Sequence, residues 1–219
     1  MARVGGPGSP VSAPFVVALL GAESTGKTTL AHELGAALAA QGHQVAVVPE
    51  YLREFCDNQG RTPRIDEQRG IADEQTRRIA AAASGHDIVI SDTTAMMIAV
   101  YSDHVFNDTA LYPHAQAAHA RCHLTLLTAL DLRWQPDGLQ RDGPQVRAPV
   151  DALVRAALAQ ARLPYSVIFG TGPHRLQAAL ACVQRALVPV PPADKSTRWH
   201  WACERCGDAA CERHRLPTA

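Results

Sequence analysis

A short segment near the N-terminus, Gly21-Ala22-Glu23-Ser24-Thr25-Gly26-Lys27-Thr28, fits the pattern G-x-x-x-x-G-K-[ST] at every fixed position. In this pattern the backbone N–H groups point at phosphate oxygens, and the lysine neutralises the β- and γ-phosphates. The threonine hydroxyl is placed to hold Mg²⁺. The sequence therefore predicts a Mg-ATP site, with Lys27 in a catalytic role and Thr28 at the metal. The expected nucleotide-binding residues are Gly21, Glu23, Ser24, Thr25, Gly26, Lys27, Thr28 and Thr29.

Two acidic residues follow later apolar runs. Glu50 comes just after Val45–Val48, and Asp92 comes just after Asp87–Ser91. A carboxylate at such a place can accept a proton from a substrate hydroxyl, or it can organise Mg²⁺ beside a phosphate loop. The alternative is structural, because Glu is favourable in the first turn of a helix and Asp commonly caps one. We favour Glu50 as the base and Asp92 at the metal, although the sequence leaves open which acid is the base.

A segment rich in proline and glycine follows a fourth apolar run and carries Trp134 and Arg141. An arginine on a loop can close over a transferring phosphoryl group, and a tryptophan can stack on a flat ring. The alternatives are a solvated arginine and a tryptophan that is partly buried against the sheet. We expect Arg141 to take part in catalysis.

Short apolar runs alternate with longer amphipathic ones, and these are the elements that must position the candidate residues. Strands are expected at Phe15–Leu20, Val45–Val48, Asp87–Ser91, His123–Thr128 and Tyr165–Gly170. Helices are expected at Gly26–Gln41, Asp66–Ala83, Pro149–Arg162 and Pro173–Ala186, with another helical stretch that breaks near residues 102–108. This order predicts an α/β protein with a P-loop NTPase fold, in which a parallel five-stranded sheet has helices on both faces. Ligands bind beyond the carboxyl ends of such strands, which is where the candidate residues lie.

Four motifs in order, G-x-E-S-x-G-K-[ST], E-Y-x-R-E, Asp92-Thr93 and the segment from Trp134 to Arg141, make residues Phe15 to Ala186 resemble a known family. The chain is similar to the ribosylnicotinamide kinase domain of NadR-type bifunctional proteins, which belong to the P-loop kinase-like ATPases. The resemblance implies transfer of the γ-phosphate of ATP to the 5′-hydroxyl of nicotinamide riboside, a step of NAD salvage. It also implies substrate contacts for Glu50, Tyr51, Arg53 and Asp92, and a stacking role on nicotinamide for Trp134.

The chain departs from that family at two positions, since Thr94 stands where an acid is common and Arg133 where a proline is common. No adenylyltransferase half fits before Phe15, so the kinase domain alone is expected. Two alternatives stay open: a kinase of another nucleoside, and a regulatory P-loop ATPase that binds a partner through its tail.

The C-terminal tail has a composition of its own. Cys203, Cys206, Cys211 and His214 are spaced C-x₂-C-x₄-C-x₂-H, which suits a tetrahedral Zn²⁺ site; the alternative is a tail with reduced thiols. We therefore expect a flexible lead-in over residues 1–13, a kinase-like domain over 14–187, a proline-rich linker over 188–198 and a possible zinc knuckle over 199–219.

Charge and composition limit the kinds of partner that the protein is expected to bind. The formal net charge is zero, which argues against a protein that works mainly by gripping nucleic acid or an anionic membrane. No apolar run is long enough to span a membrane, and the N-terminus lacks the apolar core of a signal peptide. We expect a cytoplasmic protein that acts on a small-molecule nucleoside, and the sequence does not predict its oligomeric state.

Overall fold

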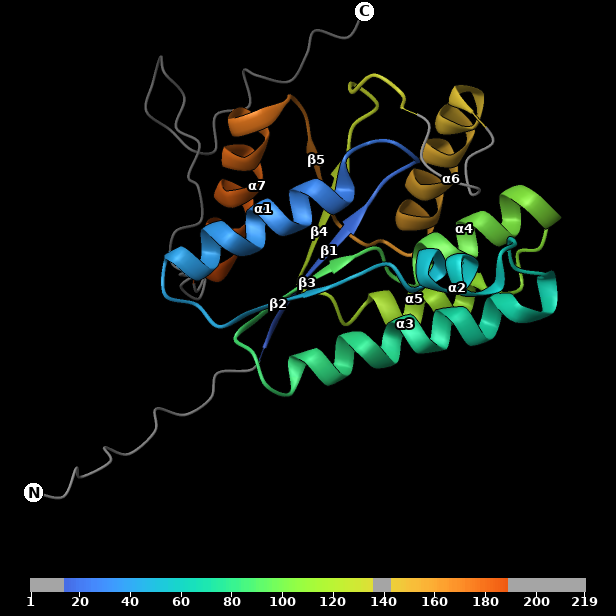
Figure 1. The fold of residues 1–219 in the computed structure, drawn as a ribbon, viewed down its shortest axis with the longest axis horizontal. Helices are drawn as coiled ribbons and strands as arrows, with labels where there is room; N and C mark the ends of the chain where they lie inside the picture. The colour runs from blue at the N-terminus through green and yellow to red at the C-terminus, as the bar shows by residue number, and fades with distance from the viewer. Residues whose placement is uncertain (1–13, 136–142, 189–219) are drawn as a thin grey trace, which may run out of the picture. The chain divides into compact units, whose positions relative to one another are not determined.

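The computed structural model of the chain describes residues 14–135 and 143–188. A parallel five-stranded sheet lies at its centre, in the order β2-β3-β1-β4-β5, with helices on both faces (Figure 1). The strands are β1 (Phe15–Leu20), β2 (Val45–Val48), β3 (Ile88–Asp92), β4 (Leu124–Thr128) and β5 (Ser166–Ile168). The α-helices are α1 (Lys27–Ala40), α2 (Tyr51–Gln59), α3 (Gln68–Ala83), α4 (Ala95–Phe106), α5 (Tyr112–His119), α6 (Arg147–Gln160) and α7 (Gly172–Leu187).

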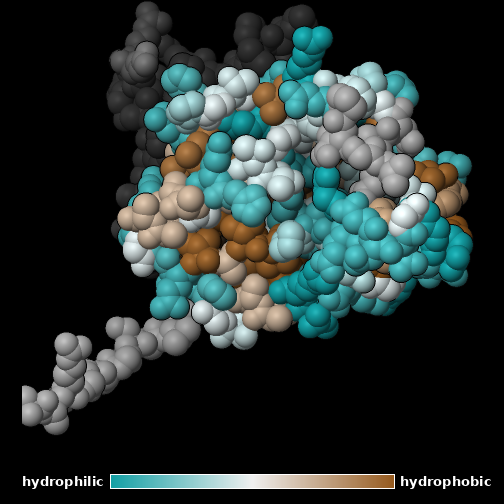
Figure 2. Space-filling model, viewed as in Figure 1, coloured by the Kyte–Doolittle hydropathy of each residue, from teal (hydrophilic) through white to brown (hydrophobic). Residues whose placement is uncertain are grey.

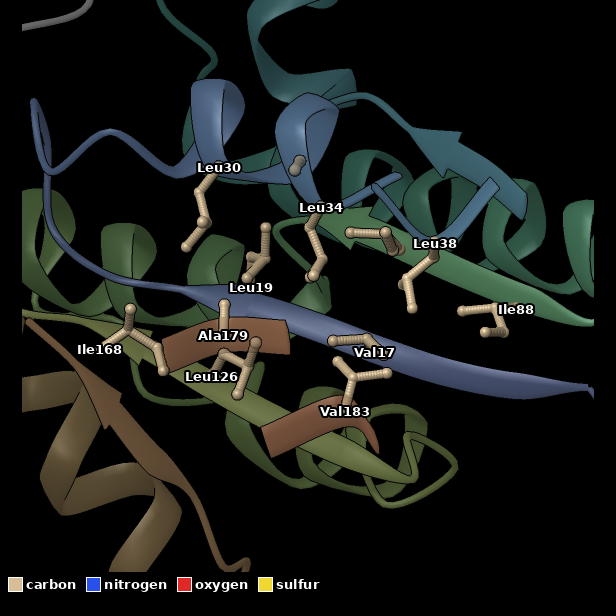
Figure 3. Packing of buried hydrophobic residues seen from close by; sticks show 12 residues of the cluster. Val17, Leu19, Leu30, Leu34, Leu38, Ile88, Leu126, Ile168, Ala179 and Val183 are labelled. Atoms are coloured by element: carbon tan, nitrogen blue, oxygen red, sulfur yellow. The ribbon is translucent and has the colours of Figure 1, made fainter. Parts of the chain in front are cut away.

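Helices α1 and α7 cover one face of the sheet (Figure 1). Because side chains alternate along a strand, Val17 and Leu19 of β1 both point to this face. Leu30, Leu34 and Leu38 of α1 recur every four residues and meet them there, as Figure 3 shows. This packing fixes α1, and with it the loop that precedes α1, on the end of β1.

Helices α3, α4 and α6 cover the other face, and α5 packs on α4 beyond them (Figure 1). Val16 and Leu20, the alternate residues of β1, point to this side. Leu20 packs with Met96 of α4 and Val154 of α6. Because α4 is buried between the sheet and other helices, it is apolar almost all round, and its start just after β3 is fixed by packing on several sides.

The predicted architecture is confirmed, with small differences at the ends of elements. The expected break after the third strand occurs at Asn107, which adopts the left-handed conformation (φ 53°) and ends α4. The fifth strand is shorter than expected, because Phe169 and Gly170 leave the sheet and Phe169 is exposed. Residues 51–59, which the sequence left as a possible helix start, form α2.

Strand β2 lies at an edge of the sheet. Figure 2 shows a largely hydrophilic face on which apolar residues gather over this edge, and three of the four β2 residues are only partly buried.

In the part of the chain that the structure describes, no helix is long and apolar enough to cross a membrane.

Candidate nucleotide and acceptor site

The phosphate loop occupies residues 21–28, between β1 and α1. Gly21 (φ 150°) and Gly26 (φ 74°) adopt backbone conformations that other residues rarely take. A Cβ on Gly21 would lie 2.0 Å from the Thr128 hydroxyl oxygen, so no side chain fits there. Lys27 begins α1, and its ammonium group donates to the Ala22 carbonyl oxygen across the loop at 2.9 Å. The loop is thus curled around the start of a helix, as anion binding requires.

Two threonines brace the loop from inside. The Thr25 hydroxyl donates to the Ala22 carbonyl oxygen at 2.8 Å, and the Thr128 hydroxyl at the end of β4 lies 2.7 Å from the Thr25 hydroxyl oxygen. Thr128 also lies 3.1 Å from the Leu20 carbonyl oxygen. Thr25 and Thr128 are both fully buried. The loop is therefore held by the strand beside it as well as by its own turns.

Thr28 and Asp92 form a pair at the carboxyl end of β3. The Thr28 hydroxyl donates to Asp92 Oδ2 at 2.5 Å. Asp92 is 2% exposed, and its Oδ1 is buried with no hydrogen-bond partner among the described residues. A buried carboxylate oxygen of this kind needs a cation or a donor. The hydroxyl and carboxylate oxygens are also the ligands that Mg²⁺ prefers, so the pair fits the predicted metal site.

A cleft of about 680 Å³ opens over the phosphate loop. One end is formed by residues 23–29 of the loop and by Leu132, Arg133 and Gln135 from the segment after β4. The Ser24 hydroxyl joins the two walls, since it accepts from the Gln135 N–H at 2.8 Å. The volume is in the usual range for a small-molecule site.

The other end of the cleft extends from the end of β2 to α4. Its lining comes from α2 and the residue before it, from the segment that leads into α3 and the first residue of α3, and from the last turns of α4. The residues are Glu50, Leu52, Arg53, Cys56, Thr62, Pro63, Gln68, Tyr101, His104, Val105 and Phe106. Burial raises the pKa of the Cys56 thiol to about 11, so this cysteine is a neutral thiol at neutral pH. Polar and apolar side chains are mixed along this lining, which suits a small molecule that is itself partly polar.

Glu50 brings an acid to this end of the cleft. It precedes the first residue of α2, yet its side chain makes no capping hydrogen bond with that helix within the described chain. Arg53 is one turn further on, and its Nε lies 3.9 Å from Glu50 Oε2. Both line the cleft, so the structure places two of the predicted substrate residues in the same cleft as the phosphate loop.

Three other predicted substrate residues, Tyr51, Asp92 and Trp134, are not among the residues that line the cleft. The guanidinium carbon of Arg78, a residue of α3, lies over the Tyr51 ring at 4.4 Å from the ring centre. Tyr51 does not line the cleft. Arg78 also pairs with Glu54, whose pKa it holds below the ordinary value. Trp134 is half-buried, and its indole N–H is buried with no partner among the described residues. The structure thus gives Tyr51 a packing contact, and the stacking role of Trp134 stays a prediction.

A buried arginine that the sequence did not single out ties three loops together. Arg175 of α7 donates to the Thr25 carbonyl oxygen at 2.6 Å and to the Gly170 carbonyl oxygen at 3.0 Å, and its Nη1 lies 3.4 Å from Asp131 Oδ1. Asp131 also accepts from the Gly170 N–H at 2.6 Å. Only the position of Arg175, in the first turn of the helix that follows the fifth strand, could have indicated that it reaches the phosphate loop.

Several predicted site residues lie outside the described residues. They are Arg141, Cys203, Cys206, Cys211 and His214. Within residues 14–135 and 143–188, no group of three or more His, Cys, Asp or Glu side chains is placed to hold a metal ion. The zinc knuckle and the catalytic role of Arg141 therefore stay predictions.

Solved structures with a similar fold include two of NadR protein. One is in complex with NR (TM-score 0.69, covering 84% of this chain and 54% of NadR), and the other with NAD and AMP-PNP (TM-score 0.65, 82% and 51%), both at 20% identity. This chain thus spans about half the length of NadR. A thymidylate kinase from Ehrlichia chaffeensis is also similar, at 14% identity and TM-score 0.57, covering 81% of this chain and 100% of its own. No match is found among curated proteins.

A family model described as an AAA domain matches residues 16–175, which include the phosphate loop, the Thr28–Asp92 pair and Arg175. At these identities the solved structures show a shared fold, and the resemblance to the NadR kinase domain is confirmed at that level. Since the model covers most of the chain, this protein belongs to the AAA domain family of P-loop proteins.

Proposed function

We propose that this protein is an ATP-dependent kinase of a small nucleoside, and that the nucleoside is nicotinamide riboside. One observation carries the proposal: a single cleft of about 680 Å³ is lined both by the phosphate loop and by Glu50 and Arg53. A nucleotide switch needs only the first end. A kinase needs both, because the acceptor hydroxyl must meet the γ-phosphate in line.

Different residues act on the two substrates, ATP and the acceptor nucleoside. The backbone of the phosphate loop and Lys27 hold the triphosphate and balance its negative charge. Thr28 and Asp92 would hold Mg²⁺, which would neutralise negative charge on the triphosphate. Glu50 accepts the proton of the acceptor hydroxyl as that oxygen approaches phosphorus. Arg53, on the same wall, orients Glu50.

The choice of nicotinamide riboside rests on motifs and on fold. The four motifs of the sequence resemble the ribosylnicotinamide kinase family, and a NadR structure of the same fold is described in complex with NR. Thymidylate kinase has a similar fold, so the fold alone does not choose the acceptor. A second candidate is a regulatory ATPase, which the cysteine-rich tail beyond the kinase-like domain favours.

An acceptor screen tests the proposal. ADP release is measured with Mg-ATP and, separately, nicotinamide riboside, adenosine, uridine or thymidine, with Lys27→Ala as the inactive control. We expect nicotinamide riboside to be phosphorylated fastest. Lys27→Ala should lose nearly all activity, because removal of the lysine charge costs several kcal/mol of transition-state stabilisation. Faster turnover of another nucleoside would change the acceptor. Steady ATP hydrolysis that no nucleoside accelerates would favour the regulatory ATPase.

A further inference from the structure

The side chain of Gln75 lies in the middle of α3, fully buried beneath the carboxyl ends of β2 and β3. Its Oε1 accepts from the Tyr51 N–H at 2.7 Å, and its Nε2 donates to the Pro49 carbonyl oxygen at 3.3 Å. These two partners flank Glu50. Because the first N–H groups of a helix have no partner inside that helix, Gln75 supplies a cap for α2 from a neighbouring element. Glu50 is therefore not needed as the cap and can line the cleft.

The same amide also reaches the end of β3. Its Nε2 lies 3.3 Å from the Ser91 hydroxyl oxygen and 3.5 Å from the Thr93 carbonyl oxygen. These partners flank Asp92. Thr93 has a φ of 78°, an unfavourable conformation for a β-branched residue, so its peptide needs support from its surroundings. That support comes from Gln75, from the Ser91 hydroxyl, which donates to the Thr93 carbonyl oxygen, and from the Leu19 carbonyl oxygen, which accepts from the Thr93 N–H at 3.0 Å.

We propose that Gln75 is a positioning residue that sets the spacing between Glu50 and Asp92. Its amide bonds the residues on either side of each acid, so one buried side chain connects the two strand ends. In the proposed function, on which the catalytic part of this inference rests, that spacing places the base relative to the metal and hence the acceptor oxygen relative to phosphorus.

An amide is the group that these contacts require. Tyr51 offers a donor, whereas Pro49 and Thr93 offer carbonyl oxygens that need a donor. A carboxylate would satisfy the first and repel the others, and an apolar side chain of the same length would satisfy none. Gln75→Met therefore keeps the volume and removes the link.

Gln116→Met is the matched control. Gln116 of α5 also uses a side-chain amide to join two elements, because its Nε2 donates to the Ala157 carbonyl oxygen of α6 at 3.4 Å. It touches neither strand end. Both variants lose a connecting amide, but Gln75→Met alone loses bonds at the strand ends, so a loss of active-site spacing should appear in Gln75→Met and not in Gln116→Met.

The first two measurements need no acceptor. Hydrogen exchange of the full chain should show faster exchange at the Tyr51 N–H in Gln75→Met, by about tenfold or more, and no change there in Gln116→Met. AMP-PNP binding titrated with Mg²⁺ should need about 10-fold more Mg²⁺ for half-saturation in Gln75→Met, while binding in EDTA stays as in the wild type. These results stand even if the wild type phosphorylates no nucleoside, so failure of the proposed function is distinguishable from failure of this inference.

With the acceptor found in the screen, kcat of Gln75→Met should fall about 10–100-fold while KM for ATP changes less than about threefold, because the phosphate loop is untouched. If Gln75→Met does not fold, Ser91→Ala removes the hydroxyl that Gln75 and Thr93 share, and it should shift the Mg²⁺ requirement in the same direction. The inference is overturned if the folded variant keeps the wild-type Mg²⁺ requirement and kcat, or if Gln116→Met loses as much kcat.

Discussion

Replacement of Arg175 by methionine tests how much the clamp between three loops contributes to the protein. Arg175 is 4% exposed, and its guanidinium group donates to two backbone carbonyl oxygens, those of Thr25 and Gly170. A hydrogen bond from a charged donor contributes about 1.5–3 kcal/mol. Removal of the buried charge and packing of the methionine chain offset part of the loss. Asp131 stays about one-third exposed and keeps its bond from the Gly170 N–H, so it is not left unsatisfied.

We therefore expect Arg175→Met to lower the free energy of unfolding by about 2–4 kcal/mol. In a domain of this size that corresponds to a fall in Tm of roughly 5–15 °C, measured by calorimetry and checked by urea denaturation. The control is Arg69→Met, which breaks an i,i+4 pair with Asp73 at 3.2 Å between two exposed side chains and should change stability by less than about 0.5 kcal/mol. AMP-PNP binding should also weaken in Arg175→Met, because the Thr25 carbonyl loses its anchor. Equal Tm shifts in the two variants, with unchanged AMP-PNP binding, would refute the reasoning.

The remaining predictions concern single side chains. Glu50→Gln should lower kcat by about 10²–10⁴-fold with little change in acceptor KM, since the amide keeps the shape of the base but accepts no proton; a normal kcat would exclude Glu50 as the base. Asp92→Asn should instead raise the Mg²⁺ needed for half-maximal rate, by about tenfold or more, and an unchanged Mg²⁺ titration would contradict its role. Burial lowers the pKa of His119 to about 4, so between pH 6.5 and 4 the unfolded chain binds a proton that the folded protein does not. Stability should then fall as the pH drops through that window, at up to about 1.4 kcal/mol per pH unit, and urea denaturation of His119→Gln should show a shallower pH dependence.

The sequence predicted the fold well because the core of this protein is regular. Val16 to Leu20 are apolar throughout, which is typical of a central parallel strand, and the leucines of α1 recur at helical spacing. The phosphate loop could also be predicted, because its chemistry is set by residues that are neighbours in the chain. Glu50 and Asp92 were placed by a general rule, since the carboxyl ends of adjacent parallel strands meet at one edge of a sheet.

Contacts between distant segments could not be read in this way. Gln75 and Arg175 each lie in an amphipathic helix, where a polar residue is expected to face water. Both are buried, because the strand ends leave backbone groups that only a side chain from another element can satisfy. Nothing in the local pattern of α3 or α7 distinguishes these residues from their exposed neighbours. The contact of Tyr51 with Arg78 was likewise not indicated by its motif, and its substrate contact stays a prediction.

The order of the strands in the sheet affects how the domain folds while the chain is being synthesised. β1 pairs with β3 and β4, so the strand that begins the domain finds its partners only after residues 88–92 and 124–128 have been synthesised. The contacts of the phosphate loop are completed later still, because its Thr25 carbonyl oxygen accepts from Arg175, 150 residues further along the chain. Contacts so distant in sequence are slow to form. We therefore expect a ribosome-bound chain that ends before α7 to bind nucleotide poorly, so that ATP contributes little to folding until the last helix has emerged.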